Sequence, residues 1–559
     1  MSSSLLALIA FLPVITILVL MVVLRIPATK AMPVSWIITG ILVLFVWRTP
    51  IKYIIAANIK GATTALDILL IVFGAMVLLF TLKESGALAA INQSFSSITK
   101  DKRIQAIIIS WLFGAFIEGS AGFGTPAALL SPLLVSLGFP AMAAVMVSLI
   151  ANTTPVSFGP VGVPTIIGLG TALDVPAVHQ SLASNGMSFP DFIYQIGLHT
   201  AILHSVMAIF VPLLAVSFMT RYFGANRSFV DGLRVWRYAI FAGFCFVVPY
   251  LLTAWLLGPE FPSLLGGAVG LAILIPLTKR GLFVPRETWN FADKSQWDKT
   301  WIGSLQIEMS NAQVTMRSWK AWLPYLCIAI VLILTRLDVL PLNTVLRFFA
   351  LKINGIFQTD VNLKFEFLYN PGVIPFIFIA LLCIPFYKMT RSQTRSVWRA
   401  SLKGIKSPFI ALIFTVPMVE MMKAGHSPQG WNSMPIVIAD FISQQTGSNW
   451  IFAAPFIGAF GAFLTGSNTV SNMLFGLFQF TVAENTGLSR IIILSLQNVG
   501  GSFGVLICIF KIIAASATVG LSGTEGAIIR KNFIPLLIYG FVTALVALLI
   551  ILVINAQLF

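Results

Sequence analysis

The sequence has few charged residues. Lys, Arg, Asp and Glu make up 10% of its 559 residues, and only 19 residues are acidic, whereas soluble proteins average about 25% charged residues. A water-soluble chain of this length could not cover its surface with so few charges, which excludes a soluble enzyme, a nucleic-acid-binding protein and a disordered protein. Apolar residues make up 58% and the mean hydropathy is +0.93, so we expect an all-α polytopic membrane protein.

The sequence also lacks the motifs of common catalytic and metal sites. Its four cysteines lie singly in apolar stretches, with no CxxC pair and no metal-ligand spacing. We find no P-loop, no His-Glu-x-x-His and no serine nucleophile elbow. We therefore expect no enzyme, no cofactor, no bound metal and no ATP-driven transport by this chain alone. The first apolar stretch follows Ser2-Ser3-Ser4 without a basic segment, which predicts a retained span rather than a signal peptide.

Apolar stretches long enough to cross a bilayer, about 20 residues each, recur along the chain. The clear ones are 5–24, 33–47, 63–82, 192–219, 237–257, 261–278, 321–338, 370–387, 407–424 and 533–555. Two further apolar regions, 104–172 and 450–517, are interrupted by Gly, Pro, Asn, Thr and Ser. We expect about 12 transmembrane crossings, two re-entrant hairpins and two interrupted helices.

Basic residues predict which segments face the cytoplasm. Three segments are rich in Lys and Arg and are expected inside: 221–237, 279–320 and 388–406. Segment 173–190 has no Lys or Arg and is expected outside. This arrangement makes 341–357 a surface helix rather than a span and places the N-terminus outside, together with the basic segment 48–60.

The two interrupted regions resemble each other. Gly114–Ser120 and Gly461–Ser467 agree at five of seven positions with an offset of 347, and Ser157-Phe158-Gly159 matches Ser502-Phe503-Gly504 with an offset of 345. Two matches in the same order with nearly equal offsets indicate an internal repeat. The spans follow the same offset and, by the loop charges, run in opposite directions, which predicts an inverted-topology repeat as in many secondary transporters.

This repeat divides the chain into three parts. Residues 1–235 form the first inverted repeat, 236–320 two connector spans with a cytoplasmic loop, and 321–559 the second inverted repeat. The paired elements within the repeats are two hairpins, 104–137 and 450–481, and two interrupted spans, 140–172 and 488–517.

The interruptions carry the polar residues. Non-helical backbone at membrane depth is tolerated only where protein covers it or where it lines a wet cavity. In the first hairpin, Thr125 is a plausible N-cap with Pro126 at the first helical position. A half-helix that begins there directs its N–H groups and positive dipole end at an anion such as a carboxylate. The alternative is that the polar residues only satisfy backbone groups at kinks.

The candidate substrate-binding residues come from these four interruptions. They are Ser120, Gly122, Asn152, Thr153, Thr154, Ser467, Asn468, Thr469, Asn472, Gln497, Asn498 and Lys511.

Ionisable residues within apolar stretches are functional candidates by default. Glu118 is a candidate for proton coupling, with a structural carboxyl as the alternative. Lys511 is either a counter-charge for a substrate carboxylate or a side chain that extends to the cytoplasmic surface. His199 and His204 are expected to be core histidines rather than proton relays, and Glu420 with Lys423 a local ion pair. Asp67 is a weaker candidate for a group facing an aqueous vestibule.

Several long motifs of this sequence resemble the bacterial lactate permease family. They are Glu118–Gly124, Asn152–Gly159, Gly466–Phe475 and Ala514–Leu521, and the likeness extends over nearly the whole chain. The resemblance implies uptake of L-lactate, with D-lactate and glycolate as further substrates, by proton symport across the bacterial inner membrane. The partners would be a small monocarboxylate, protons and lipid. The alternatives are a sodium-coupled carboxylate transporter and a passive anion channel.

Overall fold

The computed structural model describes residues 3–559 except 25, 97, 123, 305–315, 337–340, 425, 522 and 555–558. Phe123 in the first hairpin turn and the middle of segment 279–320 therefore lie outside the described residues. In the described part of the chain, ten helices are long and apolar enough to cross a membrane. The chain is thus a multi-pass, mainly helical membrane protein, as the composition predicts.

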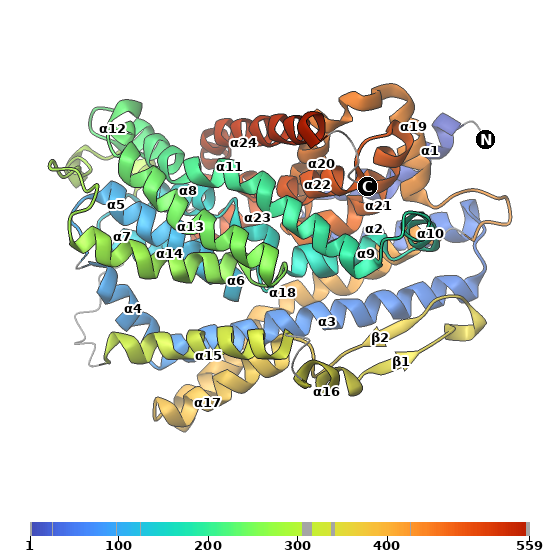
Figure 1. Ribbon diagram of the computed structural model, residues 1–559, viewed down its shortest axis with the longest axis horizontal. Coiled ribbons are helices and arrows are strands. Elements are labelled where there is room, and N and C mark those ends of the chain that lie inside the picture. The colour runs from blue at the N-terminus through green and yellow to red at the C-terminus, as the bar shows by residue number, and fades with distance from the viewer. Residues whose placement is uncertain are drawn as a thin grey trace.

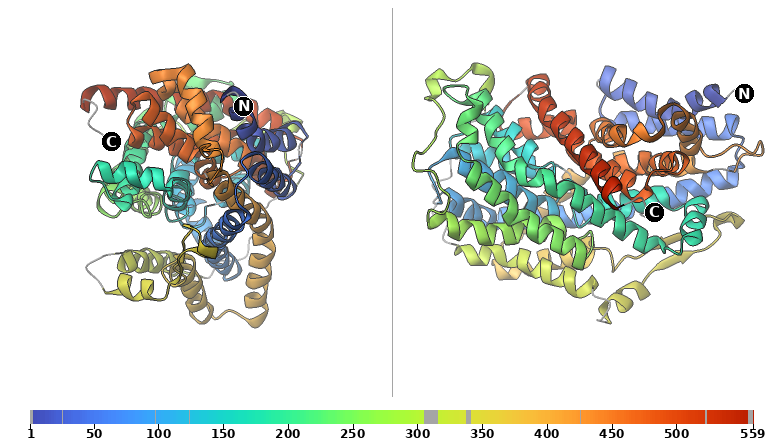
Figure 2. Two further views of the ribbon diagram at one scale, coloured as in Figure 1. Left: turned by 90° about the vertical axis from the view of Figure 1, so that its right-hand side faces the viewer. Right: turned by 45° about the horizontal axis from the view of Figure 1, so that its top comes forward.

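One block of the molecule, here called the scaffold, consists of long paired helices (Figures 1 and 2). Its central pair is α3 (Ile51–Glu84) and α18 (Arg391–Lys423). The scaffold also contains α2 (Ala28–Ile41), α15 (Ser318–Arg336), the π-helical η9 (Gly372–Phe378) and α17 (Ile379–Phe386). Glycine allows the closest approach, since a Cβ on Gly61 of α3 would lie 2.4 Å from the Cα of Pro417 in α18.

Both central scaffold helices are longer than predicted. The predicted span 63–82 is only the second half of α3, which begins at Ile51, so most of segment 48–60 is helix rather than loop. The predicted loop 388–406 is likewise mostly helix, because Thr390 and Gln393 form a capping box at the start of α18. Hydropathy marks only the apolar part of such helices and misses the polar turns that extend beyond it.

The predicted surface helix over 341–357 is only partly helical. Helix α16 (Leu342–Phe348) is followed by a small antiparallel hairpin of β1 (Leu351–Ile353) and β2 (Leu363–Phe365), in which Lys352 pairs with Lys364. These two strands are the exception to the all-α prediction within the described residues.

The second block, here called the core, contains two helical segments that fold back on themselves. In the first, α5 (Lys102–Ala106), η3 (Ile107–Phe113) and α6 (Gly114–Ser120) form one arm and α7 (Thr125–Ser136) the other. The ammonium of Lys102 donates to the Leu137 carbonyl at 2.5 Å, so the two ends of the segment meet.

The second such segment pairs α20 (Trp450–Thr465) with α21 (Asn468–Thr486). Its arms are joined by hydrogen bonds from the Trp450 indole to the Gln479 side chain, at 2.7 Å, and from the Ser471 hydroxyl to the Gly458 carbonyl, at 2.8 Å. Both segments are therefore hairpins within the protein, and their re-entry into the membrane from opposite sides stays a prediction.

Two interrupted helices cross the core beside the hairpins. The first consists of α8 (Ala141–Ala151), η4 (Pro155–Phe158), η5 (Pro164–Leu169) and α9 (Gly170–Leu173). The second consists of α22 (Arg490–Phe503), η11 (Gly504–Ile507) and α23 (Ile509–Thr518).

Within the predicted interrupted span 488–517, the sequence motif Gln497–Gly504 predicts the break, and the structure places the break later. Helix α22 continues through these residues, and the chain breaks only at Gly504–Cys508. The glycines before the break serve close packing instead of turning the chain, because a Cβ on Gly500 would lie 1.9 Å from the Pro455 carbonyl oxygen of α20.

Long helices cover the hairpins and the interrupted helices. They are α11 (Phe189–Phe223), α13 (Trp236–Leu256), α14 (Pro262–Lys279) and α24 (Glu525–Ile554). Helices α1 (Ser3–Leu18) and α19 (Met434–Thr446) pack together where the two blocks meet. The short helices are α4 (Ala87–Ser96), α10 (Pro176–Ser184) and α12 (Phe229–Leu233).

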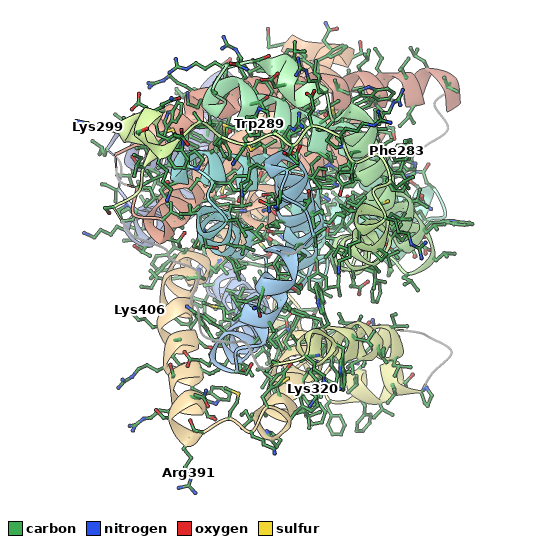
Figure 3. All side chains as sticks on the ribbon, turned by 90° about the vertical axis from the view of Figure 1, so that its left-hand side faces the viewer. Phe283, Trp289, Lys299, Lys320, Arg391 and Lys406 are labelled. Atoms are coloured by element: carbon green, nitrogen blue, oxygen red, sulfur yellow. The ribbon has the colours of Figure 1, made fainter. Side chains whose placement is uncertain are left out.

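Two of the basic segments expected inside, 279–320 and 388–406, lie at one end of the molecule. Lys299 and Lys320 of segment 279–320 and Arg391 of segment 388–406 lie at the end that faces the viewer in Figure 3. The N-terminus and α10 lie at the opposite end (Figure 1). Lys60 of the basic segment 48–60 lies beside Asp174 at the other end, so the predicted sidedness rests on the other basic segments and stays a prediction.

Candidate functional site

The turn of the first hairpin presses against the first interrupted helix. Gly122 and Gly124 have φ angles of +52° and +84°, which glycine adopts without strain. A Cβ on Gly122 would lie 2.4 Å from Cδ of Pro160, so no larger residue fits there. The predicted N-cap at Thr125 is wrong by one residue, because Gly124 takes the N-cap position of α7 without a side-chain hydrogen bond.

Glu118 lies in the last turn of the first arm, between the hairpin and the interruption. Its side chain is only 1% exposed, and one carboxylate oxygen accepts a hydrogen bond from the Asn152 amide at 2.9 Å. Gly159 lies directly against it, since a Cβ there would be 2.7 Å from Cγ of Glu118. The sequence therefore places a carboxyl group at the centre of the core with a neutral donor holding it in place.

Lys511 faces the same region from the first turn of α23. Its ammonium-bearing side chain is buried, and its Cγ lies 3.6 Å from the position of a Cβ on Gly124. Lys511 and Glu118 line one pocket. Lys511 is thus buried beside the pocket and does not extend to the cytoplasmic surface, and its role as a counter-charge for a substrate carboxylate stays a prediction.

The second hairpin contributes a capped helix start. Gly466 takes a left-handed conformation with φ +78°, and the Ser467 hydroxyl accepts a hydrogen bond from the Val470 amide as the N-cap of α21. The first N–H groups of a helix have no partner within it, and they carry the positive end of the helix dipole. This helix start opens onto the pocket through Ser467, Asn468 and Thr469.

Asn498 joins the hairpin of the second half to the interrupted helix of the first. Its side-chain oxygen accepts from the amides of Asn468 and Asn472 at 3.0 and 2.9 Å, and its own amide donates to the hydroxyls of Thr165 and Thr200 at 2.8 and 3.3 Å. Two donated and two accepted bonds use the full capacity of a carboxamide. Asn498 therefore orders the site instead of offering a free group to a ligand.

The elements meet at a small pocket in the core. Its lining residues come from both hairpins, the first interruption and α23: Glu118, Val156, Gly159, Pro160, Pro164, Gly466, Ser467, Asn468, Thr469 and Lys511. The open space is about 20 Å³, enough for a single water molecule and too small for an organic acid. In this conformation the pocket therefore has no room for an organic acid, and binding of one would need neighbouring elements to move.

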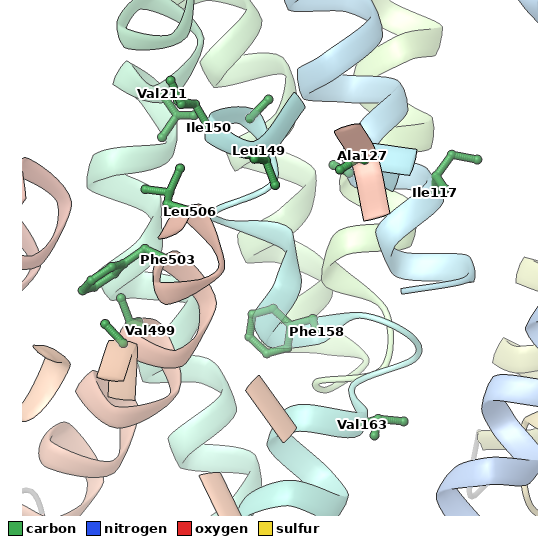
Figure 4. Close-up of a cluster of buried hydrophobic side chains, with 14 of the residues drawn as sticks. Ile117, Ala127, Leu149, Ile150, Phe158, Val163, Val211, Val499, Phe503 and Leu506 are labelled. Atoms are coloured by element: carbon green, nitrogen blue, oxygen red, sulfur yellow. The ribbon is translucent and has the colours of Figure 1, made fainter. Parts of the chain in front are cut away.

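Buried apolar side chains pack in the core around the first interruption. Figure 4 shows Phe158 at the first interruption, with Val499 and Phe503 of α22 on one side and Ile117 of the hairpin on the other. Phe158 is fully buried and packs edge-on against Tyr250, with ring centres 5.5 Å apart.

The structure divides the candidate residues into two groups. Glu118, Ser467, Asn468, Thr469 and Lys511 line the pocket. The others have partners within the protein. Four donate hydrogen bonds to neighbouring residues: Ser120 to Ile117, Thr153 to Ile150, Asn472 to Pro164 and Gln497 to Ser471. Thr154 bonds Tyr539, Asn152 donates to Glu118, Gly122 packs on Pro160, and all four hydrogen-bonding positions of the Asn498 side chain are used.

Other candidate residues have local partners away from the pocket. Glu420 and Lys423 form the predicted ion pair at 2.8 Å. Asp67 accepts a hydrogen bond from Asn370 of the scaffold at 2.5 Å. The sequence did not single out Thr165, Thr200 and Tyr539, because single hydroxyl groups in apolar spans carry no signal of their own.

These features define the class of the protein. A multi-pass helical chain with a buried, charged pocket between two hairpins and two interrupted helices has the parts of a membrane transporter, with binding groups at broken helices.

The family follows from comparison with known proteins. A family model described as L-lactate permease matches residues 6–554. The chain belongs to the L-lactate permease family, whose members are permeases and not enzymes.

The relatives agree with this membership. The chain is 35% identical to a Haemophilus influenzae protein described as an L-lactate permease, with 96% of this chain and 97% of that protein covered. It is 28% identical to the glycolate permease GlcA of Escherichia coli, covering 97% and 95% of the two chains. It is 27% identical to the Escherichia coli L-lactate permease, covering 94% and 92%.

Proposed function

We propose that this chain takes up L-lactate by proton symport, with glycolate and D-lactate as further substrates. The proposed substrate carboxylate binds Lys511 and the start of α21, and Glu118 takes the coupling proton. The observation that carries the proposal is the presence of one buried acid and one buried base on the same pocket, Glu118 and Lys511. The family membership and the names of the relatives support the substrate class.

Charge balance gives the reason for coupling. Glu118 and Lys511 are together neutral, so a bound monocarboxylate would leave one uncompensated negative charge in a buried site. Such a charge is costly at low dielectric. Protonation of Glu118 restores neutrality and lets the substrate carboxylate replace Glu118 as the counter-ion of Lys511. The proposed stoichiometry is therefore one proton for each monocarboxylate.

Alternating access would come from movement of the core against the scaffold. The pocket lies within the core, and the core contains both hairpins and both interrupted helices. We assign the basic end of the molecule to the cytoplasm of a bacterial inner membrane, which places the N-terminus outside. The inverted repeat, with its halves at 1–235 and 321–559, provides the two related arrangements that such a movement needs.

The test is uptake of labelled L-lactate into liposomes that contain the purified protein. An inward acid gradient without Na⁺ should drive uphill accumulation that a protonophore abolishes. Competition by glycolate, D-lactate and pyruvate then ranks the substrates. Accumulation driven by Na⁺ at equal pH would support the sodium-coupled alternative instead. Movement that follows only the lactate gradient would identify a passive channel.

A further inference from the structure

His204 lies at the centre of the core and is not part of the pocket. It sits in the middle of α11 with no exposed surface. Its Nε2 lies 2.9 Å from the Ser157 hydroxyl in the first interruption, and its Nδ1 lies 2.6 Å from the Tyr539 hydroxyl in α24. Both ring nitrogens therefore have one partner each, from opposite halves of the chain.

The hydrogen bonds of Ser157 determine the role of Nε2. The Ser157 hydroxyl lies 3.0 Å from the backbone carbonyl of Asn498, which accepts only. A serine hydroxyl has one proton, and here it is donated to that carbonyl. In the hydrogen bond between Ser157 and His204 the ring must then be the donor, so Nε2 carries a hydrogen.

The other ring nitrogen is an acceptor. No carboxylate among the described residues pairs with His204, and a fully buried imidazolium without a counter-charge would be costly. In the neutral ring with hydrogen on Nε2, Nδ1 accepts from the Tyr539 hydroxyl. Thr154 in turn donates to Tyr539, with the two oxygens 2.9 Å apart.

We propose that His204 is a positioning residue for transport and acts as the neutral Nε2-protonated tautomer. It closes a directed chain of hydrogen bonds, Thr154 to Tyr539 to His204 to Ser157 to Asn498, which fixes the first interruption against α22. Asn498 holds Asn468 and Asn472 at the start of α21. Through this chain His204 sets the position of the second hairpin at the substrate pocket without touching the substrate.

The tautomer is tested by nitrogen NMR of the full-length protein, labelled at histidine and reconstituted in lipid. The signals lost in His204→Gln identify His204. The expected result is a neutral ring with hydrogen on Nε2. An imidazolium, or a ring with hydrogen on Nδ1, would overturn the proposal. This measurement does not depend on which substrate is transported.

The positioning role is tested by lactate uptake, and this part rests on the proposed function. Glutamine retains an N–H donor at the position of Nε2, whereas alanine removes it. We expect His204→Ala and Ser157→Ala to raise KM for L-lactate roughly 10-fold or more, the loss from a buried group left unpaired. We expect His204→Gln to keep KM within about 3-fold of the unmodified protein. Glutamine keeps Ser157 paired, and the net loss of one hydrogen bond costs less than leaving a buried group unpaired.

The matched control is His199→Gln on the same helix. Among the described residues, the His199 ring has one hydrogen-bond partner, the Gln195 carbonyl of its own helix. We therefore expect the KM of the His199→Gln variant to be unchanged. Thermal unfolding of each variant in detergent separates misfolding from a KM effect. Equal KM values for the alanine and glutamine variants of His204, at equal stability, would contradict the positioning role. If the unmodified protein does not transport lactate, the proposed function fails while the tautomer assignment stands on the NMR result.

Discussion

At the residue scale, the proposed transport mechanism depends on two buried charges of opposite sign. Glu118 and Lys511 face one pocket from different halves of the chain. Burial of either charge alone would be costly, and the two opposite charges offset this cost for each other across the pocket. The proposed roles differ, because the acid can lose its charge by taking a proton whereas the base keeps the charge that would attract a substrate carboxylate.

Replacement of Lys511 should therefore affect substrate binding first. We expect Lys511→Gln to raise KM for L-lactate by roughly 100-fold, since loss of one partner of a buried charge pair costs about 3 kcal/mol. Lys511→Arg keeps the charge and serves as the matched control, with a KM nearer to that of the unmodified protein. Labelled uptake at several lactate concentrations measures both. An unchanged KM in Lys511→Gln would contradict the proposed carboxylate contact.

The sequence predicted the residue types at the site better than their individual roles. Glu118, Lys511 and the start of α21 were found because charge and polarity stand out in apolar stretches. Thr154 and Asn498 were also expected to bind substrate, but Tyr539 holds the first and four polar neighbours saturate the second. Such partners lie up to 385 residues apart in the chain, and no local pattern connects them.

At the element scale, glycines let the interrupted helices approach the hairpins. In α22, a Cβ on Gly500 would lie 1.9 Å from the Pro455 carbonyl oxygen, and one on Gly501 would lie 1.8 Å from the Asn468 side chain. Small residues are the usual means of close helix packing in membranes. The sequence showed these glycines as signs of a break, whereas the structure uses them within a continuous helix.

An added methyl group at this contact should force α20 and α22 apart. We expect Gly500→Ala to lower stability by about 1–3 kcal/mol, the cost of overpacking a close contact, and to reduce lactate uptake. Gly526→Ala in α24 is the matched control, because no atom lies within 4 Å of its added Cβ. Thermal unfolding of the two variants in the same detergent compares them. Equal unfolding temperatures would show that the contact between α20 and α22 tolerates the added volume.

At the scale of the whole molecule, a cluster of charges joins the scaffold to the core at the end opposite the basic segments. Lys60 of α3 bonds Asp174 at 2.8 Å and lies 3.8 Å from Glu420 of α18. Lys423 of α18 donates to the Thr171 carbonyl at the end of the first interrupted helix. The four charged residues Lys60, Asp174, Glu420 and Lys423 line an open pocket of about 300 Å³. Movement of the core against the scaffold requires these contacts to break.

An acid gradient alone does not break this cluster. Burial would raise the pKa of Asp174, but the neighbouring Lys60 and the hydrogen bonds from Lys60 and His179 outweigh it and lower the pKa to about 2. A carboxyl group whose pKa is lowered by folding stabilises the folded state at pH values above its pKa in the unfolded chain. This stabilisation is lost only as the pH falls through about 2. Asp174 therefore stays charged over the pH range of an uptake experiment, and in the proposed mechanism the cluster opens through movement of the core.

Removal of one partner should favour the form that is open at this end. The probe is a cysteine placed at Thr469 in a background without the four native cysteines, and the measurement is its rate of labelling by an impermeant thiol reagent. We expect Asp174→Asn to increase this rate several-fold, which corresponds to about 1 kcal/mol. Glu366→Gln is the matched control, since Glu366 pairs with Lys364 at 2.6 Å within the small β-hairpin. Equal labelling rates in both variants would contradict a gating role for the cluster.

The general architecture followed from the sequence, whereas the grouping of the helices did not. Hydropathy and the internal repeat located the hairpins and interrupted helices. The pairing of α3 with α18, however, joins residues from the two predicted repeats into one scaffold. Loop charge predicts sidedness, but it contains no information on which helix faces which, because that depends on the fit of side chains across the interface.

The most direct test of the transport mechanism is the effect of Glu118→Gln on two forms of lactate uptake in the same liposomes. Glutamine keeps the shape of the side chain but cannot exchange a proton. We predict that acid-driven accumulation of labelled L-lactate is abolished, while counterflow between labelled and unlabelled lactate persists, with Glu484→Gln at an exposed position as the control. Unchanged acid-driven accumulation in Glu118→Gln would contradict the assignment of the coupling proton to Glu118, and loss of counterflow as well would make Glu118 a structural or binding residue.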